Sequence, residues 1–421
     1  MAAAGSLAGA EPTLTAQQRR LNLDSFEFVW TTVRDQYWDP KLGGLNWQAV
    51  REEFLPAMQN AETMSQARQV LERMIGRLGQ SHFAIIPGFV YEDLGAKRDG
   101  EEGGAGVTGI DTRVIGGRIL VTQVDDGSPA AAQGVRPGWI IVRIEGREMA
   151  PAIAKVAEAY QKSTQRELML HHAMQARMSG RVGGTRRIEF LDGADKVVEK
   201  NIRLMMPPGE LAIFGLLPPT PVWFHARKLP SGIQYVAFNL FLDPARLMTA
   251  FGDAVASTGE NSGFIIDLRG NPGGLGIMAT GMAGWFIDKP NQQLGTMQTR
   301  QSTLKFIVNP RLPAYRGPVA MLVDGTSAST SEIFAGGLQA LGRARIFGSQ
   351  TAGAALPSLI DQLPNGDAFQ HANANYISEG GRTLEGAGVT PDLEVIPTRE
   401  ALLAGRDPVL DAAVKWIGAQ K

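Results

Sequence analysis

Hydrophobic positions change their spacing along this chain and divide it into three regions. Over residues 12–95 the apolar side chains recur every three or four positions, which predicts a helical N-terminal region. Over 105–206 short apolar runs alternate with turn residues, which predicts a small strand-rich domain with a helical insertion at 151–178. Over 210–421 apolar runs alternate with helical patterns, which predicts an α/β domain with a largely parallel sheet.

Several segments in the last two regions have a pattern clear enough to predict single elements. In the strand-rich domain we expect strands at 114–115, 119–124, 139–144, 187–191 and 197–204. In the α/β region we expect strands at 233–238, 263–268, 319–323 and 345–347, and helices at 243–258, 276–287 and 331–341. A glycine- and charge-rich stretch at 96–104 predicts a linker.

Composition narrows the function classes. Hydrophobic residues make up 44% and charged residues 20% of the 421, as in ordinary globular proteins. The formal net charge is −1 with no basic stripe, so we expect no nucleic-acid partner. The absence of cysteine excludes a thiol nucleophile, a disulfide framework and any cysteine-based metal site. The five histidines form no HExxH pair, so we expect no metal and no cofactor.

The start of the chain bears on its location. Ala8-Gly9-Ala10 before Glu11 resembles a signal-peptidase site, although a positive segment before it is missing and the apolar stretch is short. A periplasmic or secreted protein is therefore expected, with a disordered tail as the alternative interpretation. No run of about 18 apolar residues occurs, so we expect no membrane span. The oligomeric state is not determined by the sequence.

Ser329 is the first candidate for chemistry. It lies where an apolar run ends in small residues and a helical pattern begins, a geometry that projects a hydroxyl from a sharp strand-to-helix turn. The N-terminus of that helix offers unpaired N–H groups and a positive dipole end, which suit an oxyanion. The alternative is structural: Ser329 and Glu332 also have the spacing of a capping box, in which the serine only caps a helix.

A glycine turn at 270–274 follows the predicted strand 263–268 and is the second candidate. Consecutive glycines allow backbone N–H groups to approach a ligand closely, so Gly273 or Gly274 could form an oxyanion hole with Thr330. Two alternatives remain open, a plain structural turn and a dinucleotide fingerprint at 274–279. The fingerprint lacks the acidic residue expected about 20 positions later.

A serine nucleophile needs a base, and the spacing of lysines limits the choice. No lysine occurs between Lys305 and Lys415, so a Ser-Lys pair built from the segment after Ser329 is excluded. His82, which follows Ser81 in a loop at a predicted helix end, is the favoured histidine, with two further histidines as alternatives. These alternatives are His225 and His371. Glu385, flanked by glycines, is a candidate to orient the imidazole or a simple surface charge.

Three motifs carry a resemblance to a known family. They are Asp-Leu-Arg-Gly-Asn-Pro-Gly-Gly (267–274), Ser-Ala-Ser-Thr-Ser-Glu-Ile-Phe-Ala-Gly (327–336) and Glu-Gly-Ala-Gly-Val-Thr-Pro-Asp (385–392). In order and spacing they resemble the C-terminal processing (tail-specific) peptidases, and 105–206 resembles the PDZ domain of that family. The resemblance implies a ClpP/crotonase-like catalytic core with a helical N-terminal region and an inserted PDZ domain, and Ser329 as the nucleophile.

One departure from this family changes the expected mechanism. The family's catalytic lysine position holds Ala354, and its usual downstream glutamine is missing. The tricorn core proteases use histidine instead, and Leu-Gly-Gln-Ser-His (78–82) together with Glu385 is similar to their pattern. That resemblance implies His82 as general base, Glu385 as its orienter through the imidazole N–H, and Ser81 as support.

The expected function is a serine endopeptidase that cleaves polypeptides with free C-termini, near those termini, by acyl transfer through Ser329. The PDZ domain would hold the substrate's carboxylate with N–H groups of one loop. This loop contains Gly104, Ala105, Gly106 and Val107, which depart from the familiar Gly-Leu-Gly-Phe form. The alternative is a non-catalytic protein that binds peptides or other ligands on a peptidase fold, an interpretation favoured by the missing lysine.

Overall fold

The computed structural model describes residues 11–88, 105–259 and 262–420 and divides into two units. The first unit comprises the chain up to Val90 with Thr299–Ser302 and Ser358–Ala374, and the second comprises the remainder. The signal-like start, the predicted linker at 96–104 and Gly104 lie outside the described residues.

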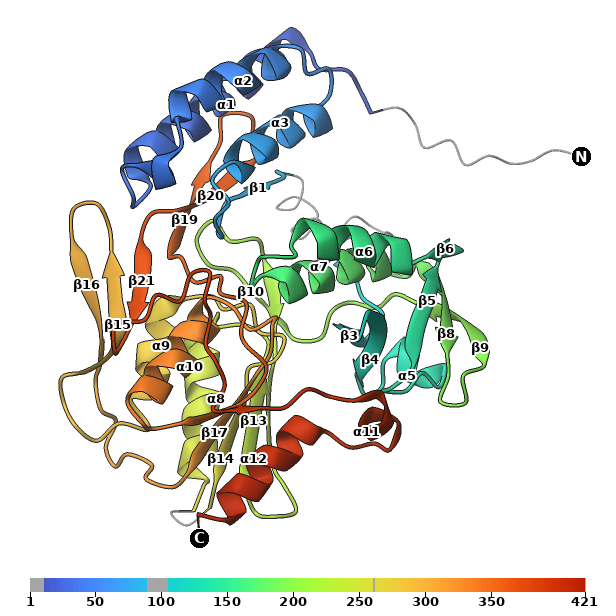
Figure 1. The fold of residues 1–421 in the computed structure, drawn as a ribbon, viewed down its shortest axis with the longest axis vertical. Helices are drawn as coiled ribbons and strands as arrows, with labels where there is room; N and C mark the ends of the chain where they lie inside the picture. Colours follow the sequence, from blue (N-terminus) through green and yellow to red (C-terminus); the bar gives the residue numbers. More distant parts are fainter. Residues whose placement is uncertain (1–10, 89–104, 260–261, 421) are drawn as a thin grey trace, which may run out of the picture. The chain divides into compact units, whose positions relative to one another are not determined.

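The first unit joins helices to a small antiparallel sheet (Figure 1). Its helices are α1 (Ala16–Gln36), η1 (Leu42–Gly44), α2 (Trp47–Gln59) and α3 (Met64–Gly76). Its strands are β1 (Ala84–Ile86), β19 (Ser358–Gln362) and β20 (Ala368–Ala372), in the order β1-β20-β19. Thr15 and Thr63 cap α1 and α3 by accepting backbone N–H groups, so these helices begin where side-chain oxygens can satisfy their first turns.

The second unit begins with a sheet domain, here called the inserted domain (residues 105–206). Its strands are β2 (Ala105–Gly106), β3 (Ile110–Ile115), β4 (Arg118–Val124), β5 (Ile140–Ile144), β6 (Arg147–Glu148), β7 (Gly180–Arg181), β8 (Thr185–Leu191) and β9 (Val197–Arg203). Its helices are α5 (Pro129–Ala132), α6 (Ala150–Ala159) and α7 (Arg166–Met178). Apolar side chains of α6 and α7 pack on the sheet β3-β4-β5-β8-β9, so the predicted helical insertion covers one of its faces.

The rest of the second unit is an α/β core around a six-stranded sheet of order β12-β13-β14-β17-β18-β22. These strands are β12 (Phe224–Lys228), β13 (Gln234–Phe238), β14 (Phe264–Asp267), β17 (Val319–Val323), β18 (Arg345–Gly348) and β22 (Leu393–Glu394). The helices are α8 (Pro244–Ala256), α9 (Gly276–Ala283), α10 (Thr330–Ala340), α11 (Arg399–Leu403) and α12 (Pro408–Gly418). All neighbours in the sheet are parallel except β12 and β13.

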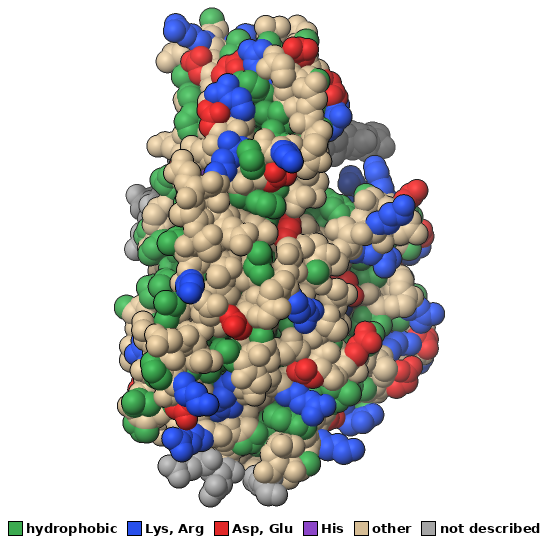
Figure 2. Space-filling view, turned by 60° about the vertical axis from the view of Figure 1, so that its left-hand side comes forward, with side chains coloured by type: hydrophobic (Ala, Val, Ile, Leu, Met, Phe, Trp, Pro, Cys, Tyr) green, Lys and Arg blue, Asp and Glu red, His purple; other side chains and the backbone are tan. Residues whose placement is uncertain are grey.

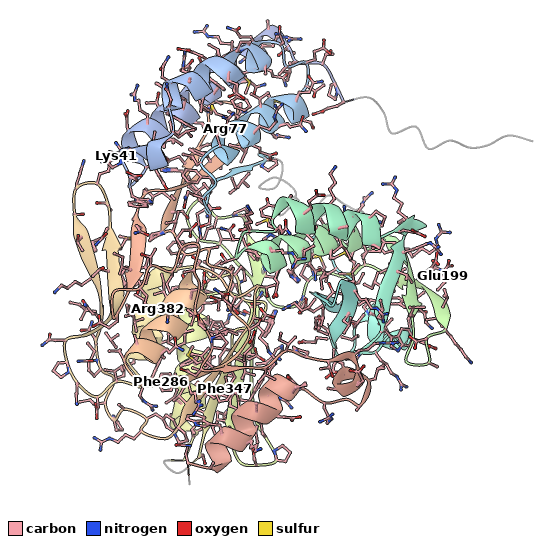
Figure 3. The ribbon with its side chains drawn as sticks, viewed as in Figure 1. Lys41, Arg77, Glu199, Phe286, Phe347 and Arg382 are labelled. Carbon is pink, nitrogen blue, oxygen red and sulfur yellow. The ribbon has the colours of Figure 1, made fainter. Side chains whose placement is uncertain are left out.

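Both faces of this sheet are covered, which explains the unbroken apolar runs in its central strands. Ile266 and Met321 belong to the cluster shared with α8, α9 and α10, whereas Ile265 and Leu322 pack with α12 on the opposite face. Phe286 and Phe347, fully enclosed by their neighbours, belong to these two clusters, one on each face (Figure 3). A parallel sheet held in this way fixes the carboxyl ends of β14 and β17 beside each other.

The predicted strands and helices of the inserted domain and the core are confirmed to within a few residues, whereas several short strands were not predicted. The missed strands include β10 (Glu210–Ala212), β11 (Thr220–Val222), β15 (Gln292–Gln298), β16 (Thr303–Val308) and β21 (Asn375–Ser378). Their burial is mixed rather than alternating, so no period of two marks them in the sequence.

On the face drawn in Figure 2, Lys and Arg side chains are interspersed with Asp and Glu side chains, in keeping with the near-zero net charge. Within the described residues, none of the helices combines the length and the apolar character that crossing a membrane requires. The same residues contain no cluster of three or more His, Asp or Glu able to hold a metal ion.

Candidate active site

Ser329 occupies a strained turn between β17 and α10. Its φ of 55° and ψ of −118° are those of the first central residue of a type II′ turn, a position that favours glycine. The N–H of Ser331 closes the turn on the carbonyl of Ala328 at 3.1 Å. A non-glycine residue held in such a conformation costs about 1–3 kcal/mol and is found mainly at functional sites. Ser329 is partly exposed, whereas Ala328 and Thr330 on either side are buried.

The hydroxyl groups of Ser327 and Ser331, on either side of Ser329, form hydrogen bonds to backbone carbonyls. Ser327 Oγ donates to the carbonyl of Leu268 at 2.8 Å, and Ser331 Oγ donates to the carbonyl of Asn271 at 2.9 Å. Both hydroxyls therefore join the turn at Ser329 to the glycine turn that follows β14. Asn271 extends the connection, since its buried amide donates to the carbonyl of Phe238 at 2.8 Å.

The two candidate oxyanion glycines lie directly beside this turn. A Cβ on Gly273 would come within 2.7 Å of Ser329 Cβ, and one on Gly274 within 2.3 Å of the carbonyl oxygen of Phe241. Both positions therefore require glycine, and the structural reason is a close approach of two backbones. Thr330 Oγ1 donates to the carbonyl of Gly274 at 2.8 Å.

The N–H groups of the three predicted oxyanion residues differ in their partners. The N–H of Gly273 donates to Asn271 Oδ1 at 2.9 Å. For the N–H groups of Gly274 and Thr330 we find no acceptor among the described residues. These two groups therefore remain available to an oxyanion, and the N–H of Thr330 is the first of α10.

The capping pattern at α10 is present together with the turn. Glu332, the third residue of the helix, accepts the N–H of Ser329 at 3.0 Å. Burial raises the pKa of Glu332 to about 7, although four hydrogen bonds to its carboxylate act in the opposite direction. Ser329 and Glu332 therefore form the capping box that the sequence predicts, and this capping is compatible with a catalytic role of Ser329.

Ala354 stands at the position of the missing lysine and is close to Ser329. Its carbonyl oxygen accepts the N–H of Ser329 at 2.8 Å. Its methyl group is buried and packs in a small cluster with Ala328, Ala352 and Leu168 of α7. The methyl group of Ala354 is therefore surrounded by apolar contacts, so we expect Ala354→Lys to crowd the site.

Glu385 lies against the same segment from a third loop. Its Oε2 accepts the N–H of Ala355 at 2.8 Å, and the N–H of Gly386 donates to the carbonyl of Gly353 at 2.8 Å. The residue is partly buried. The structure thus brings Ser329 and Glu385 to the neighbouring residues Ala354 and Ala355, although they are 56 positions apart in the sequence.

His82 belongs to the first unit, in the turn between α3 and β1. Its φ of 59° places it in the left-handed region, and its Nδ1 lies 2.7 Å from Ser81 Oγ. Desolvation on burial lowers the pKa of His82 to about 4. The imidazole is therefore neutral at physiological pH.

The two alternative histidines have other surroundings. His225 is exposed on β12, where its ring stacks near Trp223 with centroids 4.7 Å apart. His371 is buried in the first unit, and its Nε2 lies 3.0 Å from Asp361 Oδ2. Burial lowers the pKa of His371 in spite of that carboxylate.

The predicted carboxylate-binding loop is partly involved in strand pairing. Ala105 and Gly106 form β2 and pair with β7, and the N–H of Val107 donates to the carbonyl of Met205 at 2.9 Å. Gly104 lies outside the described residues. Carboxylate capture here remains a prediction, and Val107 already has a backbone partner.

The inserted domain contacts the nucleophile turn, a feature that the sequence analysis did not predict. Arg113 of β3 forms a partly buried ion pair with Asp324 at 2.8 Å and donates to Thr326 Oγ1 at 3.1 Å. Burial alone would raise the pKa of Asp324, but Arg113 and the hydrogen bonds of Thr326 hold this pKa at about 2. The start of the turn is therefore held from the inserted domain.

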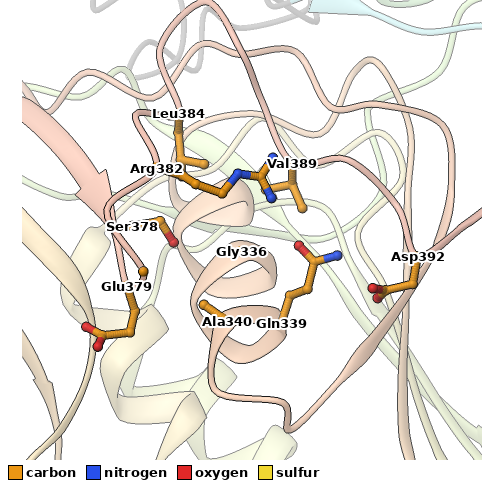
Figure 4. Close-up of a pocket in the computed structure, with 10 residues that line it drawn as sticks. Gly336, Gln339, Ala340, Ser378, Glu379, Arg382, Leu384, Val389 and Asp392 are labelled. Carbon is orange, nitrogen blue, oxygen red and sulfur yellow. The ribbon is translucent and has the colours of Figure 1, made fainter.

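A cavity of about 380 Å³ opens at the other end of α10 (Figure 4). It is lined by Gly336, Gln339 and Ala340 of the helix and by the segment that carries Arg382 and Leu384. None of its lining residues is a predicted catalytic residue. The cavity therefore lies at the opposite end of α10 from Ser329 and shares no lining residue with the predicted catalytic residues.

Comparisons with known proteins show which families the chain is similar to. The model of Peptidase family S41 matches residues 232–395, and that of the Tricorn protease C1 domain matches residues 22–76. The chain is 24% identical to carboxyl-terminal-processing peptidase 3, chloroplastic, of Arabidopsis thaliana, over 93% of this chain and 72% of the relative. It is also 24% identical to a carboxyl-terminal-processing protease of Picosynechococcus, over 88% of this chain and 82% of the relative.

Solved structures give the same fold. The photosystem II D1 C-terminal processing protease superposes with a TM-score of 0.59 at 20% identity, over 96% of this chain and 98% of that chain. The tricorn protease superposes with a TM-score of 0.52 at 16% identity, over 95% of this chain and 37% of that chain. The chain therefore has the mixed α/β fold of these proteases.

Proposed function

The chain is a serine peptidase of family S41, the carboxyl-terminal-processing peptidases, and from this premise we propose that Ser329, His82 and Glu385 carry its reaction. The observation that carries the proposal is the turn at Ser329, where a partly exposed serine is held at φ 55° between two buried neighbours. The alternative of a non-catalytic binding protein rested on the missing lysine, and a histidine base removes that difficulty.

In the proposed mechanism, Ser329 Oγ attacks the scissile carbonyl while Nε2 of His82 takes the hydroxyl proton. The tetrahedral intermediate collapses, the C–N bond breaks, and the proton passes to the leaving amine. Water, activated by the same imidazole, then hydrolyses the acyl-enzyme and leaves a new carboxylate. The N–H groups of Gly274 and Thr330 stabilise the oxyanion, since the N–H of Gly273 already donates to Asn271.

We propose that Glu385 acts through Ser81 rather than by a direct contact with the imidazole. Ser81 Oγ lies 2.7 Å from Nδ1 of His82. We propose the tautomer in which Nδ1–H donates to this hydroxyl, which leaves Nε2 for Ser329. We propose that Ser81 in turn donates its O–H to Glu385. The carboxylate then stabilises the imidazolium through Ser81, as a third group orients the base in other serine hydrolases.

The inserted domain is proposed to be a PDZ domain that captures the substrate's C-terminal segment, on a ClpP/crotonase-like core. Strand addition supplies main-chain hydrogen bonds in such capture, and the relatives named carboxyl-terminal-processing peptidases suggest a substrate with a free C-terminus. Removing the domain would leave Asp324 without Arg113, so peptide chemistry is a sharper test than deletion.

The test compares one peptide in two forms, with a free C-terminal carboxylate and with a C-terminal amide. The wild type should cleave the free form with at least about tenfold higher kcat/KM, the effect of one charge-assisted contact. Ser329→Ala should abolish cleavage and labelling by a fluorophosphonate, whereas Ser349→Ala, which alters another partly exposed serine of the same unit, should retain both. Equal cleavage of both peptide forms would contradict tail recognition, and labelling of Ser329→Ala would contradict the nucleophile.

A further inference from the structure

Glu332 is a buried carboxylate with four donors, and the proposed reaction does not use it. Its relative exposure is 0%. Its Oε1 accepts the Thr351 hydroxyl and the N–H of Gly353 at 2.8 Å. Its Oε2 accepts the N–H groups of Ser329 and Ala354, both at 3.0 Å. Each oxygen thus joins the first turn of α10 to the segment 351–354.

This arrangement exceeds what capping a helix requires. An exposed capping residue contributes about 1 kcal/mol, whereas burying a carboxylate costs several kcal/mol unless hydrogen bonds compensate. Burial accordingly raises the pKa of Glu332. A neutral side chain would cap α10 at lower cost, so the position of the carboxylate points to a task beyond helix stability.

Glu332 brings the backbone of Ser329 together with the segment at Ala354. The N–H of Ser329 is shared between Glu332 Oε2 and the carbonyl of Ala354 at 2.8 Å. Glu332 also holds the N–H of Ala354, so it fixes both the strained residue and the segment that accepts its N–H. Without this carboxylate, the cost of about 1–3 kcal/mol at φ 55° would favour relaxation of the turn.

We propose that Glu332 is a positioning residue that locks Ser329 in its reactive conformation by holding its N–H and the 353–354 segment with one carboxylate. The proposal rests on the proposed function of Ser329 as nucleophile. It assigns Glu332 no contact with the substrate. Its effect is on the reaction of Ser329 and not on substrate affinity.

The two oxygens of Glu332 make a conservative replacement informative. A glutamine can keep its oxygen toward the N–H groups of Ser329 and Ala354, where only an acceptor fits. Its NH₂ then faces the Thr351 hydroxyl, which can accept, and one bond to Gly353 is lost. Glu332→Gln therefore preserves the side that holds Ser329, whereas Glu332→Ala removes both sides.

The experiment measures kcat, KM, the fluorophosphonate labelling rate and urea unfolding for Glu332→Ala, Glu332→Asp and Glu332→Gln. Glu332→Ala and Glu332→Asp should each lower kcat and the labelling rate about 100-fold, the cost of a reacting group displaced by about 1 Å, with KM changed less than about threefold. Glu332→Gln should stay within about tenfold of the wild type. Glu332→Asp keeps the test informative if Glu332→Ala does not fold.

Leu338→Ala is the matched control, because Leu338 is buried on the same helix and packs in the core away from Ser329. It should lower stability by about 2–5 kcal/mol and leave kcat of the folded enzyme unchanged. Folded Glu332→Ala or Glu332→Asp with wild-type kcat would overturn the positioning role, as would a Glu332→Gln variant as inactive as Glu332→Ala. If Ser329→Ala retains activity, the proposed function itself fails, which is a distinguishable result.

Discussion

The nucleophile turn at Ser329 and the histidine turn at His82 share a backbone feature but are held in different ways. Both place a non-glycine residue at positive φ, 55° for Ser329 and 59° for His82. The serine is fixed by partners of its own unit, among them the distant Ala354 and the nearby, buried Glu332. The contact of His82 within its turn is with the adjacent Ser81. The turn at Ser329 is therefore held by contacts between segments, and the turn at His82 has a contact between adjacent residues.

The largest effect should come from removing either side of this pair. Ser329→Ala and His82→Ala should each lower kcat at least about 10⁴-fold, and the double variant should be little worse, because such groups act as a unit. His225→Ala, at an exposed histidine, is the matched control and should keep wild-type kcat. Steady-state kinetics on one peptide measures all four variants. If the decrease in kcat of the double variant equalled the product of the two single decreases, Ser329 and His82 would act independently.

The long-range support of the nucleophile turn can be removed at Arg113. Arg113→Met leaves Asp324 buried without its cation and should cost about 3–5 kcal/mol at pH 7. The folded pKa of Asp324, about 2, lies below its unfolded value, so the wild type keeps this stability above pH 4 and loses it as pH falls toward 2. The difference between wild type and variant in urea unfolding should therefore shrink at pH 3.

Arg316→Met is the control for Arg113, because its ion pair with Asp288 is exposed and 3.6 Å long. Its cost should stay below about 1 kcal/mol at both pH values. A cost for Arg113→Met as small as this would show that the inserted domain contributes little to holding the turn.

The local support of the histidine turn can be removed at Ser81 or at its proposed partner Glu385. Ser81→Ala and Glu385→Gln should each lower kcat about 10–100-fold, since orientation is impaired while nucleophile and base remain. If Glu385 acts through Ser81, the double variant should lose no more than the worse single one. If the decreases in kcat of the two single variants multiplied in the double variant, Glu385 would act independently of Ser81.

The smallest effect tests strain at the two positive φ angles. Ser329→Gly should be about 1 kcal/mol more stable than Ser329→Ala, because glycine adopts φ 55° without penalty. His82→Gly should likewise be more stable than His82→Ala, because His82 also has a positive φ. Urea unfolding of the four inactive variants measures both differences. Equal stability within the Ser329 pair would mean that the turn stores no strain.

The parts of the fold that follow from local pattern could be predicted from the sequence. The strands β14 and β17 are buried on both faces, so their apolar runs were clear, and small residues after β17 indicated the turn at Ser329. The support of that turn could not be predicted, because its partners are distant in sequence. Arg113 is 211 positions from Asp324, and Thr351 is 19 positions from Glu332. Glu332 itself was visible only as a capping pattern, which says nothing about burial.

The most direct test of the account is the distance between His82 and Ser329 in a crystal structure of the wild type with Ser329 acylated by a slow substrate or inhibitor. The account predicts Nε2 of His82 within about 3.5 Å of Ser329 Oγ, and Nδ1 still bonded to Ser81. A separation beyond about 8 Å, or His225 or His371 in that place, would contradict the histidine mechanism proposed here.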